Sequence, residues 1–490
     1  MSEKTVLPRE TPVKVLFATS EAAPFVKTGG LGDVSGSLPA ALAALGADVR
    51  VMLPLYSVVS EYWRKQMTFL RAFYVDLSWR SLYCGVFELK RGGVTYYFID
   101  NEHYFARGDI YGHFDDGERF GYFCRAVVES IPQLGFVPDV IHCNDWQTAL
   151  IPLYLMLEGD RVPELRRIKT LYTIHNVEYQ GRFGLDTLAD LFGLPREWYE
   201  NGLLEYYGDI SLLKGALLTA DAVTTVSPTY AEELADPFHA RGMEGVIAVC
   251  RHKLTGILNG LDMSLYDPAD DPALSRNFSV DNLAGKAENK RELQKALGLS
   301  ASPETPVVAC ISRLVPHKGF DLIAAALPRI MQLPLQLVVL GRGDWQFEQL
   351  FRNAARQYPA RLSANIMYSA SLSMGIYAGA DIFLMPSRSE PCGLAQMIAM
   401  RYGTVPVVRE AGGLKDTVFP YVPGDEKSNG FTFASYSADD MLYVLREAVD
   451  FYGDKDVWRL LQRRGMTADF SWKRSAGQYM ALYRKLAGEA

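Results

Sequence analysis

Short apolar runs that read as β-strands alternate with longer helical patterns along this chain, and this alternation limits the possible folds more than any other feature. Nearly continuous apolar runs are typical of parallel strands that are covered by helices on both faces. The runs form two series, so we predict two Rossmann-like, doubly wound α/β domains. The predicted strands are residues 13–19, 48–53, 95–100, 139–142 and 170–174, then 307–312, 336–340, 382–385 and 404–408, and the predicted helices are 36–45, 119–134, 147–157, 321–331 and 394–402.

The join between the two predicted domains lies near residues 257–271, where turn-forming Asn, Gly, Asp and Pro residues gather. We therefore predict an N-terminal domain over residues 1–260 and a C-terminal domain over residues 261–471. A last helix near residues 473–486 is expected to bring the segment 472–490 back onto the N-terminal domain. In open α/β sheets ligands bind beyond the carboxyl ends of the strands, so the expected site is a cleft between the two domains.

The composition excludes several classes of protein. Of the 490 residues, 49% are hydrophobic and 22% are charged, as in soluble globular proteins. No apolar stretch is long enough to span a membrane, and the first dozen residues lack the apolar core of a secretory signal. We therefore expect a cytoplasmic protein without a membrane partner. The net charge of −7 disfavours nucleic acid as a partner.

The six cysteines occur without a C-x-x-C pair, which argues against a disulfide framework and against structural zinc. We expect them to be reduced and mostly buried. The only D-x-D motif, at residues 454–456, falls in a polar helical region away from any predicted strand end. The seven histidines show no H-x3-H spacing, so the sequence predicts no metal site.

A glycine-rich segment, KTGGLGD, follows the first predicted strand at residues 27–33. Its glycines let backbone N–H groups approach an anion closely, and Lys27 with a helix N-terminus would add positive potential. The segment matches neither a Walker loop nor the G-x-G-x-x-G fingerprint. The alternative is a glycine-rich turn with a solvated lysine, in which Asp33 is an ordinary acid in the first turn of a helix.

Six ordered blocks resemble the bacterial glycogen synthases and plant starch synthases, which are retaining glucosyltransferases. The blocks are KTGGLGD (27–33), HCNDWQ (142–147), TIHNVEYQG (173–181), SRLVPHKG (312–319), PSRSEPCGLAQ (386–396) and RYGTVPVVREAGGLKDTV (401–418). They extend over nearly the whole chain. The resemblance implies the GT-B architecture, with two Rossmann-like domains facing across a cleft that holds a nucleotide-sugar donor. It also implies catalysis without a metal or other cofactor.

In the C-terminal domain, Arg313 and Lys318 follow a predicted strand on a loop that Gly319 helps to turn. A bidentate guanidinium and a compact ammonium together suit a diphosphate. A solvated loop explains the R-x4-K-G pattern equally well, and the resemblance favours the diphosphate. His317 stands where the family usually has Gln, which leaves the role of this side chain open.

The SEPCGL segment places Glu390 just past a strand and Cys392, Gly393 and Leu394 at a helix N-terminus. Free N–H groups there can bind a phosphate or sugar oxygen, and the Glu390 carboxylate can accept from sugar hydroxyls. We expect Cys392 to be a partly exposed thiol that lines the pocket, with a pKa lowered by the helix N-terminus. Ala395 stands where the bacterial family commonly has Thr, so one hydroxyl contact to phosphate is expected to be missing.

In the N-terminal domain, short polar side chains end two predicted strands. The resemblance places His175 beside the donor glucose, although a lone histidine is more often a hydrogen-bonded core residue. Tyr111 and Tyr368 resemble residues that flank the glucan and the adenine. A glycine pair, Gly412–Gly413, is expected to let backbone approach the donor sugar. The other residues expected to bind substrate are Lys27, Gly30, Asp33, Asn144, Asp145 and Asn176.

The resemblance implies transfer of glucose from ADP-glucose to the non-reducing end of an α-1,4-glucan such as glycogen or starch, with retention of configuration. The implied catalytic residues are His175, Arg313, Lys318 and Glu390. No carboxylate stands out as a nucleophile, which favours same-face attack over double displacement.

Two alternatives remain at the level of sequence. One is another enzyme of the same architecture, such as a UDP-glucose-dependent transferase, because the fold alone does not set the donor. The other is a catalytically silent glucan-binding relative. That relative would need to have lost one of the residues that bind the donor, yet all of them are present.

Overall fold

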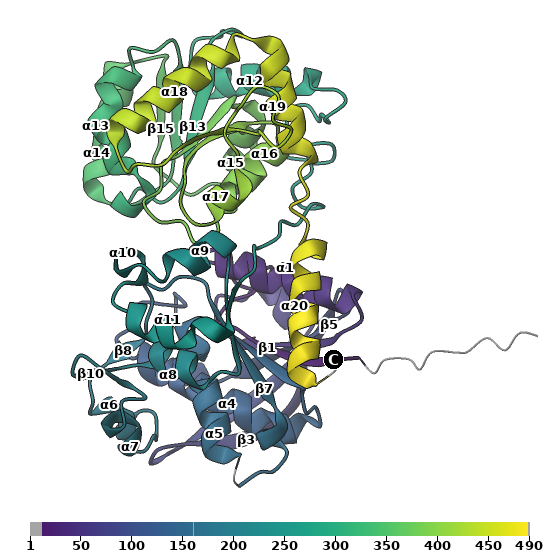
Figure 1. The fold of residues 1–490 in the computed structure, drawn as a ribbon. Coiled ribbons are helices and arrows are strands. Elements are labelled where there is room, and N and C mark those ends of the chain that lie inside the picture. Colours follow the sequence, from purple (N-terminus) through teal and green to yellow (C-terminus); the bar gives the residue numbers. More distant parts are fainter. Residues whose placement is uncertain (1–11, 160, 489–490) are drawn as a thin grey trace, which may run out of the picture. The chain divides into compact units, whose positions relative to one another are not determined.

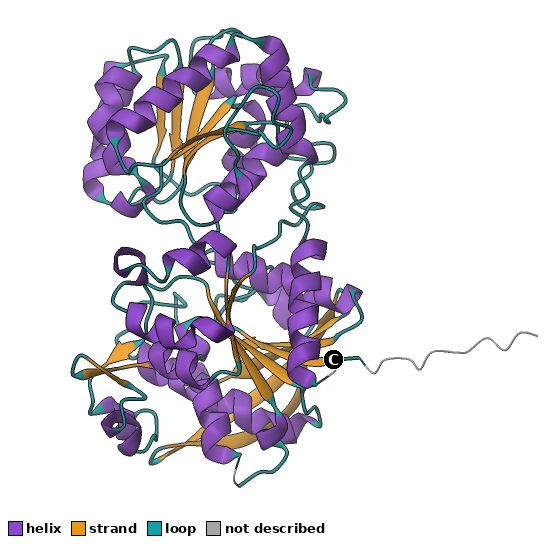
Figure 2. Ribbon diagram, in the orientation of Figure 1, coloured by secondary structure: helices purple, strands orange, loops and turns teal. Residues whose placement is uncertain are grey.

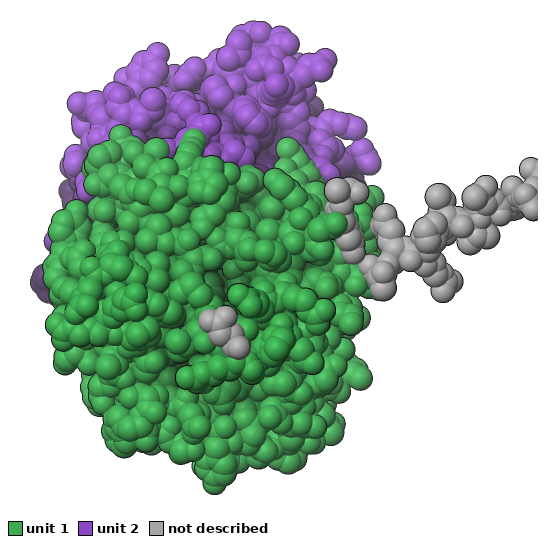
Figure 3. Space-filling view, turned by 60° about the horizontal axis from the view of Figure 1, so that its bottom comes forward, with its two compact units in different colours: residues 1–226, 234–257, 472–490 green, residues 227–233, 258–471 purple. Residues whose placement is uncertain are grey.

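The computed structural model describes residues 12–159 and 161–488, which form two compact units (Figure 3). The first unit comprises residues 1–226, 234–257 and 472–490, and the second comprises residues 227–233 and 258–471. The sequence predicts residues 227–233 in the N-terminal domain, whereas their contacts lie in the second unit. The Thr229 hydroxyl donates to Asp416 at 2.7 Å, and the Gly412 N–H donates to the Glu233 carboxylate at 2.9 Å.

The first unit is built on a nine-stranded sheet with the order β12-β11-β7-β6-β1-β2-β5-β4-β3. All neighbours are parallel except β5-β4 and β4-β3, which are antiparallel. A small antiparallel sheet has the order β8-β10-β9. The strands are β1 (Lys14–Ala18), β2 (Asp48–Pro54), β3 (Thr68–Leu77), β4 (Arg80–Arg91), β5 (Val94–Asp100), β6 (Val140–Asn144), β7 (Lys169–Ile174), β8 (Arg182–Phe183), β9 (Glu205–Tyr206), β10 (Asp209–Ser211), β11 (Ala222–Thr225) and β12 (Leu254–Gly256).

The prediction of purely parallel sheets is therefore wrong at one edge of this sheet. Strand β3 exposes most of its side chains, including Phe69 (51% exposed) and Tyr74 (69% exposed). This edge strand contains a short apolar run, residues 72–75, but Arg71 and Asp76 flank it on both sides, and the prediction missed the strand. Ser78, at a φ of 57°, lies in the turn that joins β3 to β4.

Helices cover this sheet, as the ribbon shows (Figures 1 and 2). The helices of the first unit are α1 (Gly30–Ala44), α2 (Glu61–Arg64), α3 (Glu102–Phe105), α4 (Asp116–Leu134), α5 (Leu150–Glu158), α6 (Thr187–Asp190), α7 (Glu197–Glu200), α8 (Leu212–Thr219), α10 (Pro237–Ala240), α11 (Glu244–Cys250) and α20 (Trp472–Ala487). No helix in the described ranges combines the length and the apolar character needed to cross a membrane.

Helix α1 begins at Gly30, six residues before the predicted start at residue 36, so the glycine-rich segment forms its first turn. Glycine is a poor helix former, which hides this turn from a pattern-based prediction. Close packing explains the residue type: a Cβ on Gly36 would lie 2.6 Å from the Ala23 carbonyl oxygen. Gly32 similarly lies against the Lys27 side chain.

The C-terminal helix α20 packs on the first unit, beside α1. Its Tyr483 hydroxyl lies 2.7 Å from Nδ1 of the fully buried His142 on β6. Nε2 of His142 lies 2.6 Å from the Thr173 hydroxyl on β7. Both imidazole nitrogens therefore have partners, and burial holds the pKa of His142 well below its usual value.

The second unit has a six-stranded parallel sheet with the order β15-β14-β13-β16-β17-β18. Its strands are β13 (Val307–Ile311), β14 (Gln336–Leu340), β15 (Leu362–Asn365), β16 (Ile382–Met385), β17 (Val405–Arg409) and β18 (Phe431–Phe433). Its helices are α9 (Pro228–Glu233), α12 (Ala284–Ala296), α13 (Phe320–Ile330), α14 (Trp345–Gln357), α15 (Ala370–Gly379), α16 (Ala395–Arg401), α17 (Gly413–Thr417), α18 (Ala438–Tyr452) and α19 (Lys455–Thr467).

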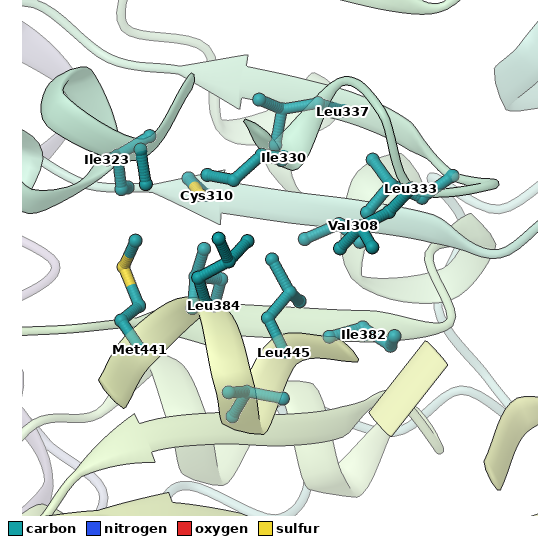
Figure 4. Packing of buried hydrophobic residues seen from close by; sticks show 14 of the residues in the cluster. Val308, Cys310, Ile323, Ile330, Leu333, Leu337, Ile382, Leu384, Met441 and Leu445 are labelled. Atoms are coloured by element: carbon teal, nitrogen blue, oxygen red, sulfur yellow. The ribbon is translucent and has the colours of Figure 1, made fainter. Parts of the chain in front are cut away.

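Figure 4 shows part of the core of this unit, where side chains of α13 and α18 pack against β13, β14 and β16. Val308 and Leu337 are completely buried, as are Ile323 and Leu445 from the two helices. The strands are buried under helices, so their sequences are continuous apolar runs. The predicted bounds of β14 and β16 are confirmed.

Candidate active site

In the first unit, the turn at the start of α1 holds Lys27 and Asp33 as an ion pair, with Nζ and Oδ1 2.6 Å apart. Both side chains are partly exposed, at 38% and 22%. Burial raises the pKa of Asp33, although the charge of Lys27 opposes this change. Gly29 precedes the helix without a side-chain cap, and a Cβ on Gly29 or Gly30 would meet nothing within 4 Å. The first N–H groups of α1 are therefore open to an anion.

His175 follows β7 and lies beside Asn144, the last residue of β6. Its Nε2 is 2.9 Å from Asn144 Oδ1, while the Asn144 amide nitrogen donates to the carbonyls of Ala18 and His142. Because Oδ1 only accepts, Nε2 carries the proton and Nδ1 has the lone pair. Burial lowers the pKa of His175 to about 3, so the imidazole is neutral at physiological pH.

Asp145 fixes the backbone that carries His175. Its Oδ1 accepts from the N–H groups of His175, at 2.8 Å, and Asn176, at 3.4 Å. Asp145 itself has a φ of 55°, a conformation that costs a non-glycine residue about 1–3 kcal/mol and is often found at functional sites. Burial raises the pKa of its carboxyl to about 7, and the charge of Glu21 adds to this change.

Glu21 is a buried acid next to these residues that sequence analysis did not select. It is 3% exposed and accepts from the Thr28 backbone N–H and hydroxyl. Burial raises its pKa. Tyr111 joins the same cluster: its hydroxyl lies 2.6 Å from the Ser20 hydroxyl. Burial raises the pKa of Tyr111, and the charges of Glu21 and Asp145 add to this change. The signal in the sequence that could have revealed Glu21 is a single acid soon after a buried strand.

In the second unit, Lys318 and Glu390 form a bidentate ion pair, with Nζ 2.9 Å and 2.7 Å from the two carboxylate oxygens. Ser387 also donates to Glu390, at 3.1 Å. Gly319, at a φ of 81°, sets this geometry, because a Cβ there would lie 2.1 Å from the Pro386 carbonyl oxygen. The two sequence blocks that contain Lys318 and Glu390 therefore meet at one place.

Arg313 is exposed and has no ion pair within the described ranges, so its guanidinium is available to a ligand. Tyr368, expected near the adenine, is 85% exposed and follows β15. Among residues 12–159 and 161–488, no group of three or more His, Cys, Asp and Glu residues could hold a metal ion.

The expectation of a partly exposed Cys392 with a lowered pKa is wrong. The residue is 5% exposed, and burial raises the pKa of its thiol to about 12. Desolvation of the thiolate thus outweighs the helix N-terminus that follows it. Gly393 and Leu394 lead into α16, and Gly393 has a φ of 73°. All six cysteines are free and buried, as predicted.

The glycine pair at residues 412–413 packs against the segment that carries Glu390. A Cβ on Gly412 would lie 2.1 Å from the Glu390 carbonyl oxygen, and one on Gly413 would lie 2.1 Å from the Cys392 carbonyl oxygen. The Gly413 N–H donates to the Glu390 carbonyl at 3.1 Å. The close approach that these glycines allow is therefore to protein backbone, and it positions Glu390.

We expect Gly412→Ala to lower the free energy of unfolding by about 3 kcal/mol, because the φ of 45° and the steric clash with Glu390 act together. Gly424 is the matched control: it has a φ of 84° but open space around its Cβ position. Gly424→Ala should lower the free energy of unfolding by only about 1 kcal/mol. Urea unfolding followed by circular dichroism measures both. Equal effects of the two substitutions would contradict the packing role of Gly412.

Two family models match this chain: the starch synthase catalytic domain over residues 14–249 and the glycosyl transferases group 1 over residues 292–456. The glycogen synthases of Geobacillus thermodenitrificans and Clostridium novyi are each 48% identical to this chain. These alignments cover 97% of this chain and 98% and 99% of the relatives. The chain belongs to the glycogen synthase family. It is thus a glycosyltransferase, as the six sequence blocks imply.

Solved structures agree with this family assignment. The catalytic domain of starch synthase IV from Arabidopsis thaliana, bound to ADP and acarbose, matches with a TM-score of 0.90 and 36% identity, over 98% of this chain and all of that one. A sucrose-phosphate synthase from Thermosynechococcus elongatus, at 18% identity and a TM-score of 0.61, shares the fold alone. The predicted class, two Rossmann-like α/β units of the GT-B type, is confirmed.

Proposed function

We propose that this glycogen synthase family member transfers glucose from ADP-glucose to the non-reducing end of an α-1,4-glucan, with retention of configuration. The observation that carries the proposal is the 48% identity to glycogen synthases over 97% of the chain. The similar starch synthase IV was solved with ADP and acarbose, which supports an adenine nucleotide and a glucan as substrates. The proposal assigns the donor to the second unit and the acceptor side to the first. A cytoplasmic location stays a prediction.

Arg313 and Lys318 are proposed to bind the diphosphate. Arg313 is exposed and can offer its planar fork to two phosphate oxygens. The Lys318 ammonium is held by Glu390, whose side chain is 8% exposed, so its charge is fixed in place before the donor arrives. Negative charge grows on the leaving diphosphate as the glucosyl bond breaks, and a preorganised cation stabilises that charge without reorganisation. Lys27 is proposed to add positive potential once it leaves Asp33.

Glu390 and His175 are proposed to act on the glucose. The Glu390 carboxylate can accept from sugar hydroxyls while it also holds Lys318. His175, with a pKa of about 3, is neutral and therefore does not repel the positive charge that develops on the glucosyl carbon. It does not act as a general acid at neutral pH, and its Nε2–H is used by Asn144, so its Nδ1 is proposed to accept a hydrogen bond from a hydroxyl of the donor glucose. Its main-chain carbonyl is proposed to face the developing positive charge.

The proposed reaction proceeds on one face of the sugar. The bond between the glucosyl carbon and the phosphate oxygen breaks, and the electron pair stays with the diphosphate, which leaves as ADP. The acceptor hydroxyl at position 4 attacks the same face and forms the new α-1,4 bond. Its proton passes to the departing phosphate oxygen. A diphosphate is a good leaving group, so no separate general acid is needed.

Donor choice is tested by initial rates with glycogen and either ADP-glucose or UDP-glucose, measured as release of the corresponding nucleoside diphosphate. We expect kcat/KM for ADP-glucose to exceed that for UDP-glucose by at least tenfold. Higher kcat/KM with UDP-glucose would reject the donor assignment and keep the reaction. Binding of glycogen without turnover of either donor would identify a silent glucan-binding protein.

Asp145 should make the first unit less stable as the pH rises. Its pKa is raised from 3.8 to about 7, so the folded form favours the protonated carboxyl, and stability present at low pH is lost through pH 7. Asn cannot ionise and keeps an acceptor for the N–H groups of His175 and Asn176. We expect the stability of Asp145→Asn relative to the wild type to rise by on the order of 3 kcal/mol between pH 4.5 and pH 8.

Thermal unfolding at a series of pH values measures this difference. The control is Asp109→Asn, which removes an exposed carboxyl from the same unit. A change with pH for Asp145→Asn that does not exceed that of the control would show that the pKa of the Asp145 carboxyl is not raised.

A further inference from the structure

Residues 227–233, which contain helix α9, form a short strap. The strap belongs to the second unit, although the residues on either side of it belong to the first. Val226 and Leu234, which flank the strap, are both buried, so its two ends are fixed in place. Ser227 begins the helix, since its hydroxyl accepts from the Tyr230 N–H at 3.0 Å. The chain therefore leaves the first unit, packs on the second over this short helix, and returns to the first.

The strap binds α17 at two points (Figure 1). Thr229 donates to the Asp416 carboxylate twice, from its backbone N–H at 3.0 Å and from its hydroxyl at 2.7 Å. Glu233, four residues after Thr229, accepts from the N–H of Gly412, four residues before Asp416, at 2.9 Å. Residues four apart lie on the same face of a helix, so the start of α9 is bound to the end of α17 and the end of α9 to the start of α17.

The contact of Glu233 leads to the proposed catalytic groups. Gly412 packs so closely on the Glu390 carbonyl oxygen that a Cβ there would lie 2.1 Å from it, and the Gly413 N–H donates to the same oxygen at 3.1 Å. The Glu390 carboxylate in turn holds the Lys318 ammonium. The turn at residues 412–413 therefore helps to set the position of both side chains, and Glu233 holds this turn in place.

We infer that Glu233 is a positioning residue for the transfer reaction, which acts through Gly412 on Glu390. The inference rests on the proposed function, because the roles of Glu390 and Lys318 belong to it. A displacement of a reacting group by about 1 Å can lower a rate by about a hundredfold, even when the substituted residue is remote from the chemistry. Since the flanks of the strap belong to the unit proposed to bind the acceptor, an extension of that unit positions a group that acts on the donor.

Initial rates with glycogen and saturating ADP-glucose test this inference. We expect Glu233→Ala to lower kcat at least tenfold. Its affinity for ADP should stay within threefold of the wild type, since the strap holds the turn before α17 and not the loop after β13 that carries Arg313. Glu233→Gln keeps an oxygen that can accept from the Gly412 N–H, so its kcat should stay within threefold. Glu232→Ala is the matched control: it removes an exposed carboxylate from the same helix and should leave kcat within twofold.

A double-mutant cycle separates positioning from a general loss of stability. If Glu233 acts through Glu390, Glu233→Ala should change kcat by less than threefold in a Glu390→Gln background. A residue with a purely structural role would lower kcat by the same factor in both backgrounds. The inference is overturned by equal factors, by an unchanged kcat in Glu233→Ala, or by a kcat of Glu233→Gln as low as that of Glu233→Ala. A wild-type chain that transfers no glucose from ADP-glucose would instead reject the proposed function, and the inference with it.

Discussion

Lys318→Ala is expected to lower kcat by about a hundredfold or more, which corresponds to roughly 3 kcal/mol of transition-state stabilisation. The Lys318 side chain is 17% exposed, and its ammonium is held at 2.7 Å and 2.9 Å by Glu390, so the wild type presents a fixed charge to the leaving diphosphate. A neighbouring water cannot replace it. Steady-state rates with saturating glycogen and donor measure the effect.

The substitution has a second consequence that must be separated from the first. Without Lys318, the buried carboxylate of Glu390 loses its partner, and a buried charge left in this way destabilises a protein. Lys318→Ala combined with Glu390→Gln removes both charges and should restore the stability but not the rate. Lys427→Ala removes an exposed lysine from the same unit and is the control for a change in net charge. A folded Lys318→Ala protein with kcat within threefold of the wild type would reject the role of this lysine.

His175→Ala is expected to lower kcat by about a hundredfold while it leaves the affinity for ADP nearly unchanged. The two effects differ because the proposed hydrogen bond goes to the glucose, which ADP lacks. The substitution also leaves the buried Asn144 Oδ1 without its donor at 2.9 Å. His175→Gln keeps a neutral donor for Asn144 Oδ1 and an acceptor for a glucose hydroxyl, so it should recover part of the lost rate.

The pH dependence gives an independent test of the same residue. With a pKa of about 3, His175 does not change its charge between pH 5 and pH 9. Any pH-dependent step that kcat of the wild type shows over that range should therefore remain in His175→Gln. Loss of such a step in the variant would show that the imidazole titrates during catalysis. An unchanged kcat in His175→Ala would reject its role altogether.

The sequence predicts the strands that are buried on both faces and little of what lies at the edges. Strands β14 and β16 have the predicted bounds, because a covered strand is a continuous apolar run. Strand β3 was missed because its longest apolar run, residues 72–75, is flanked by Arg71 and Asp76, and exposure does not follow hydrophobicity in it: Phe69 and Tyr74 face solvent. The placement of residues 227–233 in the second unit depends on the bonds of Thr229 to Asp416, which is 187 positions away.

Except for Tyr111 and Tyr368, the candidate site residues came from the six sequence blocks. The contacts among these residues came from the structure. Nothing local to Lys318 indicates that it pairs with Glu390, 72 positions away. Burial also changed the chemistry that spacing suggested: the pKa of Cys392 is raised where a helix N-terminus alone would lower it. Glu21 was missed because a single acid after a strand is a weak signal until its burial is known.

The most direct test of the proposed glucosyl transfer is incorporation of label from ADP-[¹⁴C]glucose into glycogen, followed by digestion of the precipitated polymer with β-amylase. The proposal predicts labelled polymer from which β-amylase releases labelled maltose, since the enzyme cleaves α-1,4 bonds from non-reducing ends. Label that stays in the polymer after digestion would contradict α-1,4 extension. If the protein binds glycogen but no label enters the polymer, the result would contradict the claim that the protein is a glucosyltransferase.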